Sequence, residues 1–306
     1  MVTVLDKDNL AISAIVTVGM QIFFFIIAAV GKFDKVTDLA GGANFVVLAV
    51  LSFFLSQYYH ARQIAVTLMV GIWGTRLAAY CLYRIIKIGT DERFNGIRES
   101  LPKFAMFWLF QAVWVFSVSL SMLLVNSPRW GSPSNPVPEF GTVADIVGTI
   151  MWIVGFLIEA VADHQKFLFR MNPLNNGRFC DAGLWSWTRH PNYFGDILLW
   201  FGIFTIQTSI IDPRNPDHSW MWVGIISPLV TMLLLLFLSG MPKLERGSDE
   251  KYGDLPEYQD YKNSVSPLIP MPMAVYSRLP FPVKVCLFEF PMYDSRRIIK
   301  RRRTGL

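Results

Sequence analysis

Seven long apolar runs constrain the fold of this chain more than any other feature. They cover about residues 10–30, 43–57, 64–83, 104–125, 142–162, 194–211 and 219–240. A helix needs about 20 mainly apolar residues to cross the hydrocarbon core, where its backbone groups must be hydrogen-bonded within the protein. The sequence therefore predicts an all-α fold, a polytopic membrane helix bundle of about seven transmembrane helices. The second and sixth runs are short or polar enough to be tilted, broken or re-entrant.

Composition and charge support a membrane protein and set its orientation. Hydrophobic residues make up 53% of the 306 residues and charged residues 17%, and the mean hydropathy is +0.38, which excludes an ordinary soluble domain. Most of the 28 Lys and Arg residues fall on one side of the runs, and the positive-inside rule makes that side cytoplasmic. We expect the N-terminus outside and the C-terminus in the cytoplasm. The net charge of +5 follows from this topology and predicts no nucleic-acid partner.

Several common classes of site are excluded by missing motifs. The three cysteines, Cys81, Cys180 and Cys286, form no CxxC pair, so neither a disulfide framework nor a metal site is predicted. The chain has no P-loop, no HExxH, no GxSxG, and no GxGxxG following a strand. A Rossmann domain would also need alternating strands and helices, which the runs do not provide.

The polar stretch from Asp163 to Asp196 separates two of the apolar runs. Asp163, Lys166 and Arg170 follow one another at i, i+3 and i+7, so on a helix they share one face. Pro191 suits the first turn of a new helix, because that position needs no amide donor. The free N–H groups of such a helix start favour an anion.

This stretch and the segment after the last run contain a set of groups suited to a nucleotide. Arginine and lysine side chains suit phosphates, and carboxylates and amides suit ribose hydroxyls. The candidate cofactor-binding residues of this kind are Asp163, Arg170, Arg178, Arg189, Asn192, Tyr193, Asp196 and Lys262. The alternative is that these charges only decorate a cytoplasmic loop. Polar groups at membrane depth are usually functional, so we predict a nucleotide-bearing cofactor.

Candidate substrate and catalytic residues lie in or beside the apolar runs. Arg76 falls inside the third run, where a charge faces a cavity or a partner. Trp200 falls one turn after Asp196 on the sixth run, on the wall of a possible ligand channel. Gln111 is an amide in an aromatic wall, and Glu159 lies one turn before Asp163. Arg76 and Trp200 are therefore the candidates for substrate binding.

Several motifs taken together resemble one family. RHPNYFGD (189–196), with DHQK (163–166) and GLW (183–185) before it and LER (244–246) after it, resembles the C-terminal domain of steroid 5-alpha-reductases. The similarity is to a poorly characterised branch with the RHPNY-G motif. GTRLAAYCLYR (74–84), GTDERF (89–94) and FWLFQAVW (107–114) resemble the N-terminal half of that branch. The resemblance covers about residues 30–270.

The resemblance implies a cofactor and a reaction. Members of that family bind NADPH at the cytosolic side and deliver hydride to the C=C bond of an enone lipid. It implies the same role for Asp163, Arg170, Arg178, Asn192, Asp196 and Lys262, and adds Tyr258, which precedes Lys262 by one helical turn. Asp196 stands where the reductases have Glu, and Lys262 where they have Arg. The catalytic candidates, from the part that would hold the substrate, are Tyr80, Gln111 and Glu159.

The expected organisation is a membrane-embedded reductase-like domain over residues 1–270, followed by a basic cytoplasmic tail over 271–306. Within the domain, 30–162 forms the substrate half and 163–270 the cofactor half. The expected partners are the lipid bilayer and a hydrophobic lipid substrate, in the endoplasmic reticulum if the owner is eukaryotic. Two other functions stay open. One is an S-adenosylmethionine-dependent methyltransferase of a lipid or isoprenylcysteine, because such enzymes share RHP-Y-G; the other is a non-catalytic membrane subunit that retains the fold.

Overall fold

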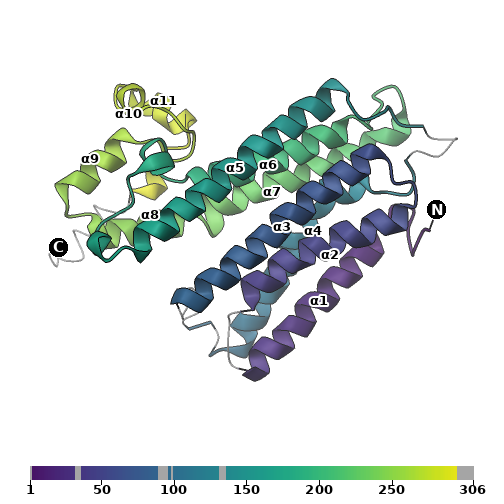
Figure 1. Ribbon diagram of the computed structural model, residues 1–306, viewed down its shortest axis with the longest axis horizontal. Coiled ribbons are helices and arrows are strands. Elements are labelled where there is room, and N and C mark those ends of the chain that lie inside the picture. Colours follow the sequence, from purple (N-terminus) through teal and green to yellow (C-terminus); the bar gives the residue numbers. More distant parts are fainter. Residues whose placement is uncertain (1, 32–35, 89–95, 98, 131–135, 295–306) are drawn as a thin grey trace. The chain divides into compact units, whose positions relative to one another are not determined.

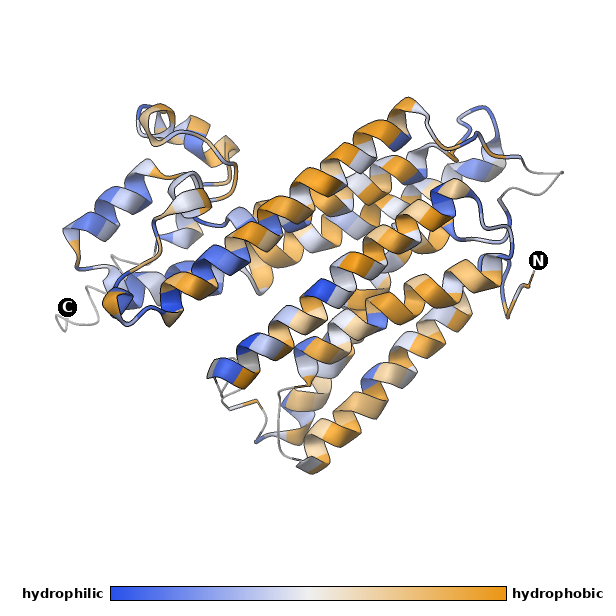
Figure 2. Cartoon of the chain, viewed as in Figure 1, coloured by the Kyte–Doolittle hydropathy of each residue, from blue (hydrophilic) through white to orange (hydrophobic). Residues whose placement is uncertain are grey.

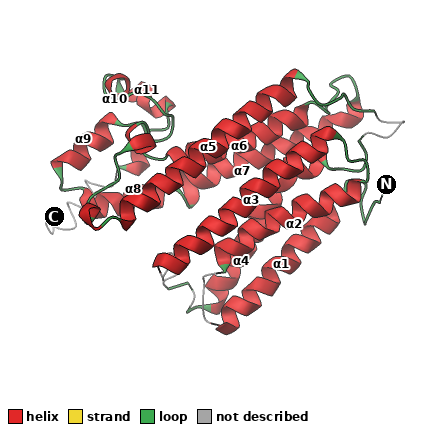
Figure 3. Cartoon of the chain, in the orientation of Figure 1, coloured by secondary structure: helices red, strands yellow, loops and turns green. Residues whose placement is uncertain are grey.

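The computed structural model of the chain describes residues 2–31, 36–88, 96–97, 99–130 and 136–294. Within these ranges it is helical and contains no strand, as Figure 3 shows. The long helices are α1 (Leu10–Gly31), α2 (Thr37–Ser56), α3 (Ala61–Ile88), α4 (Leu101–Val125), α5 (Val143–Met171) and α6 (Pro191–Thr208). Then follow η4 (Pro216–Ile225), α7 (Ile226–Leu233), the π-helical η5 (Leu234–Leu238), α8 (Met241–Tyr252) and α9 (Pro256–Ser264). The short elements are η2 (Pro173–Asn175), η3 (Gly183–Ser186), α10 (Met273–Tyr276), α11 (Phe281–Cys286) and η6 (Pro291–Tyr293).

Six helical segments of the described chain are long and apolar enough to cross a membrane, which confirms the polytopic all-α fold. They are Leu10–Gly31, Thr37–Ser56, Ala61–Arg84, Leu101–Val125, Val143–Met171 and His218–Tyr252. The predicted span at 194–211 corresponds to α6, which is 18 residues long and is not among the six. Asn192, Asp196 and Gln207 lower the mean hydropathy of this helix, so its position in the bundle depends on packing against other helices.

Polar side chains fix the starts of two helices, and a proline begins a third. The Asp6 carboxylate accepts hydrogen bonds from the backbone amides of Leu10 and Ala11 at 3.1 and 2.6 Å, which caps α1. At the start of α5, the Thr142 hydroxyl and the Asp145 carboxylate accept from each other's backbone amides. Pro191 begins α6, as its sequence context predicts.

The chain divides into two compact units, and the first comprises residues 1–152 and 200–230. In this unit α2 packs against α1, α3 and α4. Its core contains an aromatic cluster in which the ring of Phe45 lies 5.0, 5.1 and 5.6 Å, between centroids, from Trp73, Trp114 and Trp200. A buried ion pair of 2.8 Å joins Arg62 to Asp145. Aromatic packing and a charge pair thus hold this unit together.

The second unit comprises residues 153–199 and 231–306 and holds most of the predicted polar site. Figure 1 shows its helices α8 to α11, and Figure 2 shows that α8, α9 and the end of α5 are more hydrophilic than the long helices. The sequence placed the boundary between halves at 162/163 and a tail from 271, whereas unit 2 begins at Ile153 and includes the helical segment 271–294. The GTDERF motif (89–94) and the basic run at 296–303 lie outside the described residues.

Candidate functional site

The end of α5 meets the start of α6 through a polar pair in unit 2. The side-chain amide of Asn192 donates to the Asp163 carboxylate, with an Nδ2–Oδ1 distance of 3.1 Å. The helices come this close because Gly155 and Gly195 face each other, and a Cβ on Gly155 would lie 2.6 Å from the Gly195 carbonyl oxygen. The other amide atom, Asn192 Oδ1, is buried and has no hydrogen-bond partner among the described residues. A bound donor could satisfy it.

The loop between these helices folds back along α5. Gly183 has a φ of +63°, and the side chain of Gln165 fills the space where a Cβ would stand. Gln165 also accepts from the backbone amide of Leu184 at 3.0 Å. The Trp185 indole donates to the carbonyl of Ala162 at 3.0 Å, and Lys166 Nζ lies 4.0 Å from the centroid of the indole ring. The loop is therefore held against the polar face predicted for α5.

The segment just before α6 pairs with the chain that follows α9. Thr188 and Ser266 form a parallel β-bridge, and the amide of Arg189 donates to the Ser266 carbonyl at 2.8 Å. The amide of Met271 donates to the Trp187 carbonyl at 3.1 Å. Residues about 80 positions apart along the chain are thereby fixed beside the start of α6.

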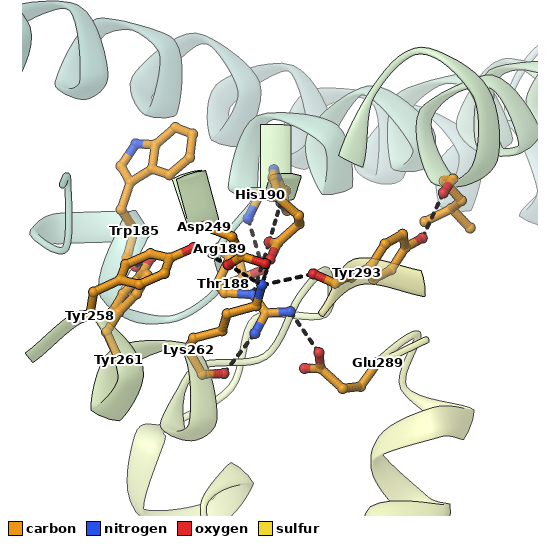
Figure 4. Close-up of polar contacts among 12 residues, drawn as sticks. Trp185, Thr188, Arg189, His190, Asp249, Tyr258, Tyr261, Lys262, Glu289 and Tyr293 are labelled. Atoms are coloured by element: carbon orange, nitrogen blue, oxygen red, sulfur yellow. Dashed lines mark hydrogen bonds and ion pairs between the residues drawn. The ribbon is translucent and has the colours of Figure 1, made fainter. Parts of the chain in front are cut away.

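A network of buried charges includes Arg189, the residue next to the Thr188–Ser266 bridge, and Figure 4 shows its polar contacts. Arg189 contacts the carboxylates of Glu245 at 3.1 Å and Glu289 at 2.9 Å, and donates from Nη1 to the Lys262 carbonyl at 2.6 Å. Lys262 Nζ contacts Asp249 at 2.6 Å and Glu245 at 3.0 Å. The side chains of Arg189, Lys262, Glu245 and Asp249 are at most 4% exposed. Each buried charge is thus compensated by an opposite charge.

Histidine and tyrosine groups complete this network. His190 Nε2 lies 2.8 Å from Glu245, and its ring stacks on Tyr193 with 5.3 Å between centroids. Burial lowers the pKa of His190 below its ordinary value, although Glu245 acts in the opposite direction. The Tyr258 hydroxyl donates to Asp249 at 3.0 Å, and burial together with the nearby carboxylates raises its pKa above the usual range. His190 is therefore neutral and Tyr258 protonated near neutral pH.

The predicted cofactor residues fall into three groups. Arg189, Tyr258 and Lys262 are buried inside the charge network, where carboxylates already contact them. Arg170 and Arg178 are exposed. The remaining four residues, at the end of α5 and the start of α6, are half-buried: Asp163, Asn192, Tyr193 and Asp196. The second and third sets leave polar surface that a ligand could reach.

The predicted substrate and catalytic residues lie in both units. Arg76 and Arg84 flank the ring of Tyr80, with guanidinium carbons 5.3 and 5.9 Å from its centroid. Gln111 donates to the carbonyl of Thr37 at 2.8 Å and is buried where α4 meets the start of α2. Trp200, 1% exposed, is part of the aromatic core of unit 1, and Glu159, 5% exposed, belongs to unit 2. Their roles in substrate binding and catalysis stay predictions.

Six members of the charge network were not identified from the sequence as site residues. They are His190, Glu245, Asp249, Tyr276, Glu289 and Tyr293. The sequence did contain a signal for Glu245 and Asp249. They are spaced i, i+4 and so share one face of a helix, as Tyr258 and Lys262 do. Glu289 and Tyr293 are also four positions apart, but Pro291 lies between them and no continuous helix spans them, so the spacing is no signal there. Among the described residues no group of His, Cys, Asp and Glu could hold a metal ion.

Known proteins match this chain over parts of their length. Uncharacterized protein C594.04c of Schizosaccharomyces pombe is 24% identical over 233 residues, which are 68% of this chain and 63% of that protein. The probable O-methyltransferase ustE of Ustilaginoidea virens is 41% identical over 75 residues, 24% of this chain and 26% of that protein. The Delta(14)-sterol reductase of Arabidopsis thaliana is 25% identical over 109 residues, 32% and 27% respectively.

The extent of these matches limits what they show. The matched regions span less than two thirds of the length of each of these relatives. No solved structure matches the chain. The similarity to a sterol reductase and to an O-methyltransferase agrees with the predicted reductase-like superfamily without being specific to it. A family described as "Protein of unknown function (DUF1295)" matches residues 24–265, which is most of the sequence, and the chain belongs to that family.

Proposed function

We propose that this membrane protein is a reductase that uses NADPH to reduce a C=C bond of an enone-type lipid or steroid-like substrate. The observation that carries the proposal is the Asp163–Asn192 pair at the meeting point of α5 and α6. Its free amide oxygen, Asn192 Oδ1, suits a donor such as a carboxamide or a ribose hydroxyl. The partial similarity to a sterol reductase supports the same reaction class.

The exposed cations supply the phosphate-binding part of the proposal. Arg170 lies two turns after Asp163 on α5, and Arg178 follows in the loop; both side chains are exposed. A guanidinium can hold a phosphate through two parallel N–H bonds. Arg189, Lys262 and Tyr258 are buried and already contact carboxylates. In this proposal they stabilise the structure around the cofactor site and do not bind the phosphates. Asp196 and Tyr193 complete the proposed cofactor set.

The proposed reaction needs a hydride, a proton and a dry channel for the lipid. Bound at this site, NADPH would supply the hydride for the β carbon of the enone. The chain supplies the acid that polarises the carbonyl oxygen, and a proton is added at the α carbon. Tyr80 is the candidate with an acidic hydroxyl, held beside Arg76, while Glu159 and Gln111 are the others. Arg76 would orient a polar end of the lipid, and Trp200 would shape the apolar wall.

A second candidate function is methyl transfer from S-adenosylmethionine. It is favoured by the 41% identity with the probable O-methyltransferase, the highest among these relatives, although over only 75 residues. S-adenosylmethionine has no phosphate, so the exposed arginines would have no role in binding it. The two functions therefore differ in their dependence on Arg170.

Calorimetric titration of the detergent-purified protein with NADPH and with S-adenosylmethionine tests the proposal. We expect the wild type to bind NADPH and Arg170→Ala to raise the Kd about tenfold or more, because a hydrogen bond to a charged group contributes about 1.5–3 kcal/mol. Asn192→Ala should weaken binding in the same direction. The matched control is Arg246→Ala, which removes an exposed arginine that pairs with Glu250 on α8.

The titrations also decide between the alternatives. Binding of S-adenosylmethionine alone would replace the reductase with the methyltransferase. A wild-type protein that binds neither cofactor would leave the non-catalytic membrane subunit. An equal loss of NADPH binding in Arg246→Ala would show that surface charge in general, and not this site, governs the affinity.

A further inference from the structure

The C-terminal segment, residues 271–294, lies beyond the family match at 24–265, yet it belongs to unit 2. It supplies the last contacts of the buried charge network. We propose that Glu289 is a positioning residue, which fixes Arg189 and through it the start of α6, where the proposed cofactor site lies. The expected effect on NADPH binding rests on the proposed function, whereas the fixing of Arg189 by Glu289 does not.

Glu289 uses both carboxylate oxygens within the network. Oε1 accepts from Arg189 Nη2 at 2.9 Å, and Oε2 accepts from the hydroxyl of Tyr276 at 2.6 Å. Tyr276 is fully buried, and the Glu289 side chain is 16% exposed. A carboxylate held from two sides has little freedom to turn away from the guanidinium.

The guanidinium of Arg189 depends on this contact. Its Nε faces Glu245, its Nη1 donates to the Lys262 carbonyl, and its Nη2 donates to Glu289. Nε thus has an ion-pair contact only, whereas Nη1 and Nη2 each have a hydrogen-bond acceptor, and of the three contacted residues only Glu289 comes from beyond the family match. Without that partner, one edge of a buried guanidinium would lose its acceptor.

A second contact ties the same segment to the opposite side of the network. The carbonyl of Tyr293 accepts from Lys262 Nζ at 2.7 Å, and its hydroxyl donates to the carbonyl of Leu236 at 2.7 Å. Tyr293 is 1% exposed. The C-terminal segment is therefore anchored independently of Glu289, so a change at Glu289 can alter Arg189 without releasing the segment.

Arg189 connects the network to the cofactor site through three residues of chain. Its amide donates to the Ser266 carbonyl, and His190 and Pro191 lead directly to Asn192. Asn192 in turn holds Asp163 on α5. If Arg189 is free to move, the Asn192 amide loses its fixed orientation, and a ligand must order it on binding.

The test compares Glu289→Gln with Glu289→Asp and Tyr293→Phe in the full-length protein. The Gln variant fits sterically because Gln and Glu have nearly the same size and shape; Glu289 also borders a cleft of about 240 Å³, lined by Lys262, Phe281, Lys284 and Phe290. The measurements are hydrogen–deuterium exchange of the backbone amides of Arg189, His190 and Asn192 without ligand, the Kd of NADPH, and the melting temperature.

We expect Glu289→Gln to accelerate exchange at these amides about tenfold and to raise the NADPH Kd about tenfold, with partial rescue in Glu289→Asp. Tyr293→Phe should lower the melting temperature but leave exchange and Kd unchanged. Unaltered exchange in Glu289→Gln would overturn the proposal, and tighter NADPH binding would show that Glu289 competes with the cofactor. A wild type that does not bind NADPH defeats the proposed function, and the exchange result alone then decides the positioning role.

Discussion

At the scale of single residues, His190 gives the site a pH dependence. Burial lowers its pKa in the folded protein below the ordinary value of about 6.5. The unfolded chain therefore takes up the proton first as the pH falls. The stabilising contribution of neutral His190 is complete above about pH 6.5 and is lost as the pH falls through the folded-state pKa.

We expect the melting temperature of the detergent-purified protein to fall between pH 7 and pH 5, and His190→Gln to make this decrease smaller. The control is His164→Gln, which removes an exposed histidine of α5 and should leave the pH profile of the wild type. Equal profiles for wild type and His190→Gln would assign the acid sensitivity to other groups.

Among single residues, local features could be predicted from the sequence, but contacts between distant residues could not. The spacing of Asp163 and Arg170 and the helix start at Pro191 are local features, and the sequence contains them in full. The partners of Arg189 are 56 and 100 positions away, in Glu245 and Glu289. No local sequence pattern indicates contacts over such distances. Because arginine and lysine bind buried carboxylates as well as phosphates, only the fold shows which of the two roles a basic residue has.

At the scale of elements, the contact between α5 and α6 in unit 2 depends on glycine. A Cβ on Gly155 would lie 2.6 Å from the Gly195 carbonyl oxygen and 2.7 Å from the Leu199 amide nitrogen. These are backbone atoms of a helix and cannot move aside alone. We expect Gly155→Ala to destabilise the protein by about 1–3 kcal/mol, the range typical of overpacking, and to lower the melting temperature.

The matched control is Gly247→Ala on α8, where an added Cβ meets nothing within 4 Å. This change should stabilise the protein by about 0.5–1 kcal/mol through helix propensity alone. A similar effect of both substitutions would contradict close packing of α5 on α6. The apolar runs predicted these helices, but not which faces meet, because glycine positions within a span have no hydropathy signature.

At the scale of the whole molecule, the apolar runs were sufficient to predict a polytopic helical bundle, because a bilayer restricts spanning segments so strongly. The two units differ from the two predicted halves, whose boundary was placed at 162/163. Helices α5 and α6 each contribute residues to both units, so a boundary drawn between spans does not coincide with the packing. The segment 271–294 was interpreted as tail from its proline spacing and basic ending, yet it contains the buried Tyr276 and Tyr293.

Two truncated chains therefore distinguish the contribution of the C-terminal segment to stability from that of the residues after it. A chain ending at Asp294 keeps every contact that the described residues make in the buried network, and we expect its melting temperature and elution in detergent to match the full-length protein. A chain ending at Pro270 lacks Glu289 and Tyr293, which leaves Arg189 and Lys262 with fewer acceptors. Because breaking a buried charge pair costs about 3–5 kcal/mol, it should melt much lower or aggregate. If the chain ending at Pro270 were as stable as the full-length protein, the C-terminal segment would be an appendage, and the positioning role of Glu289 would be wrong.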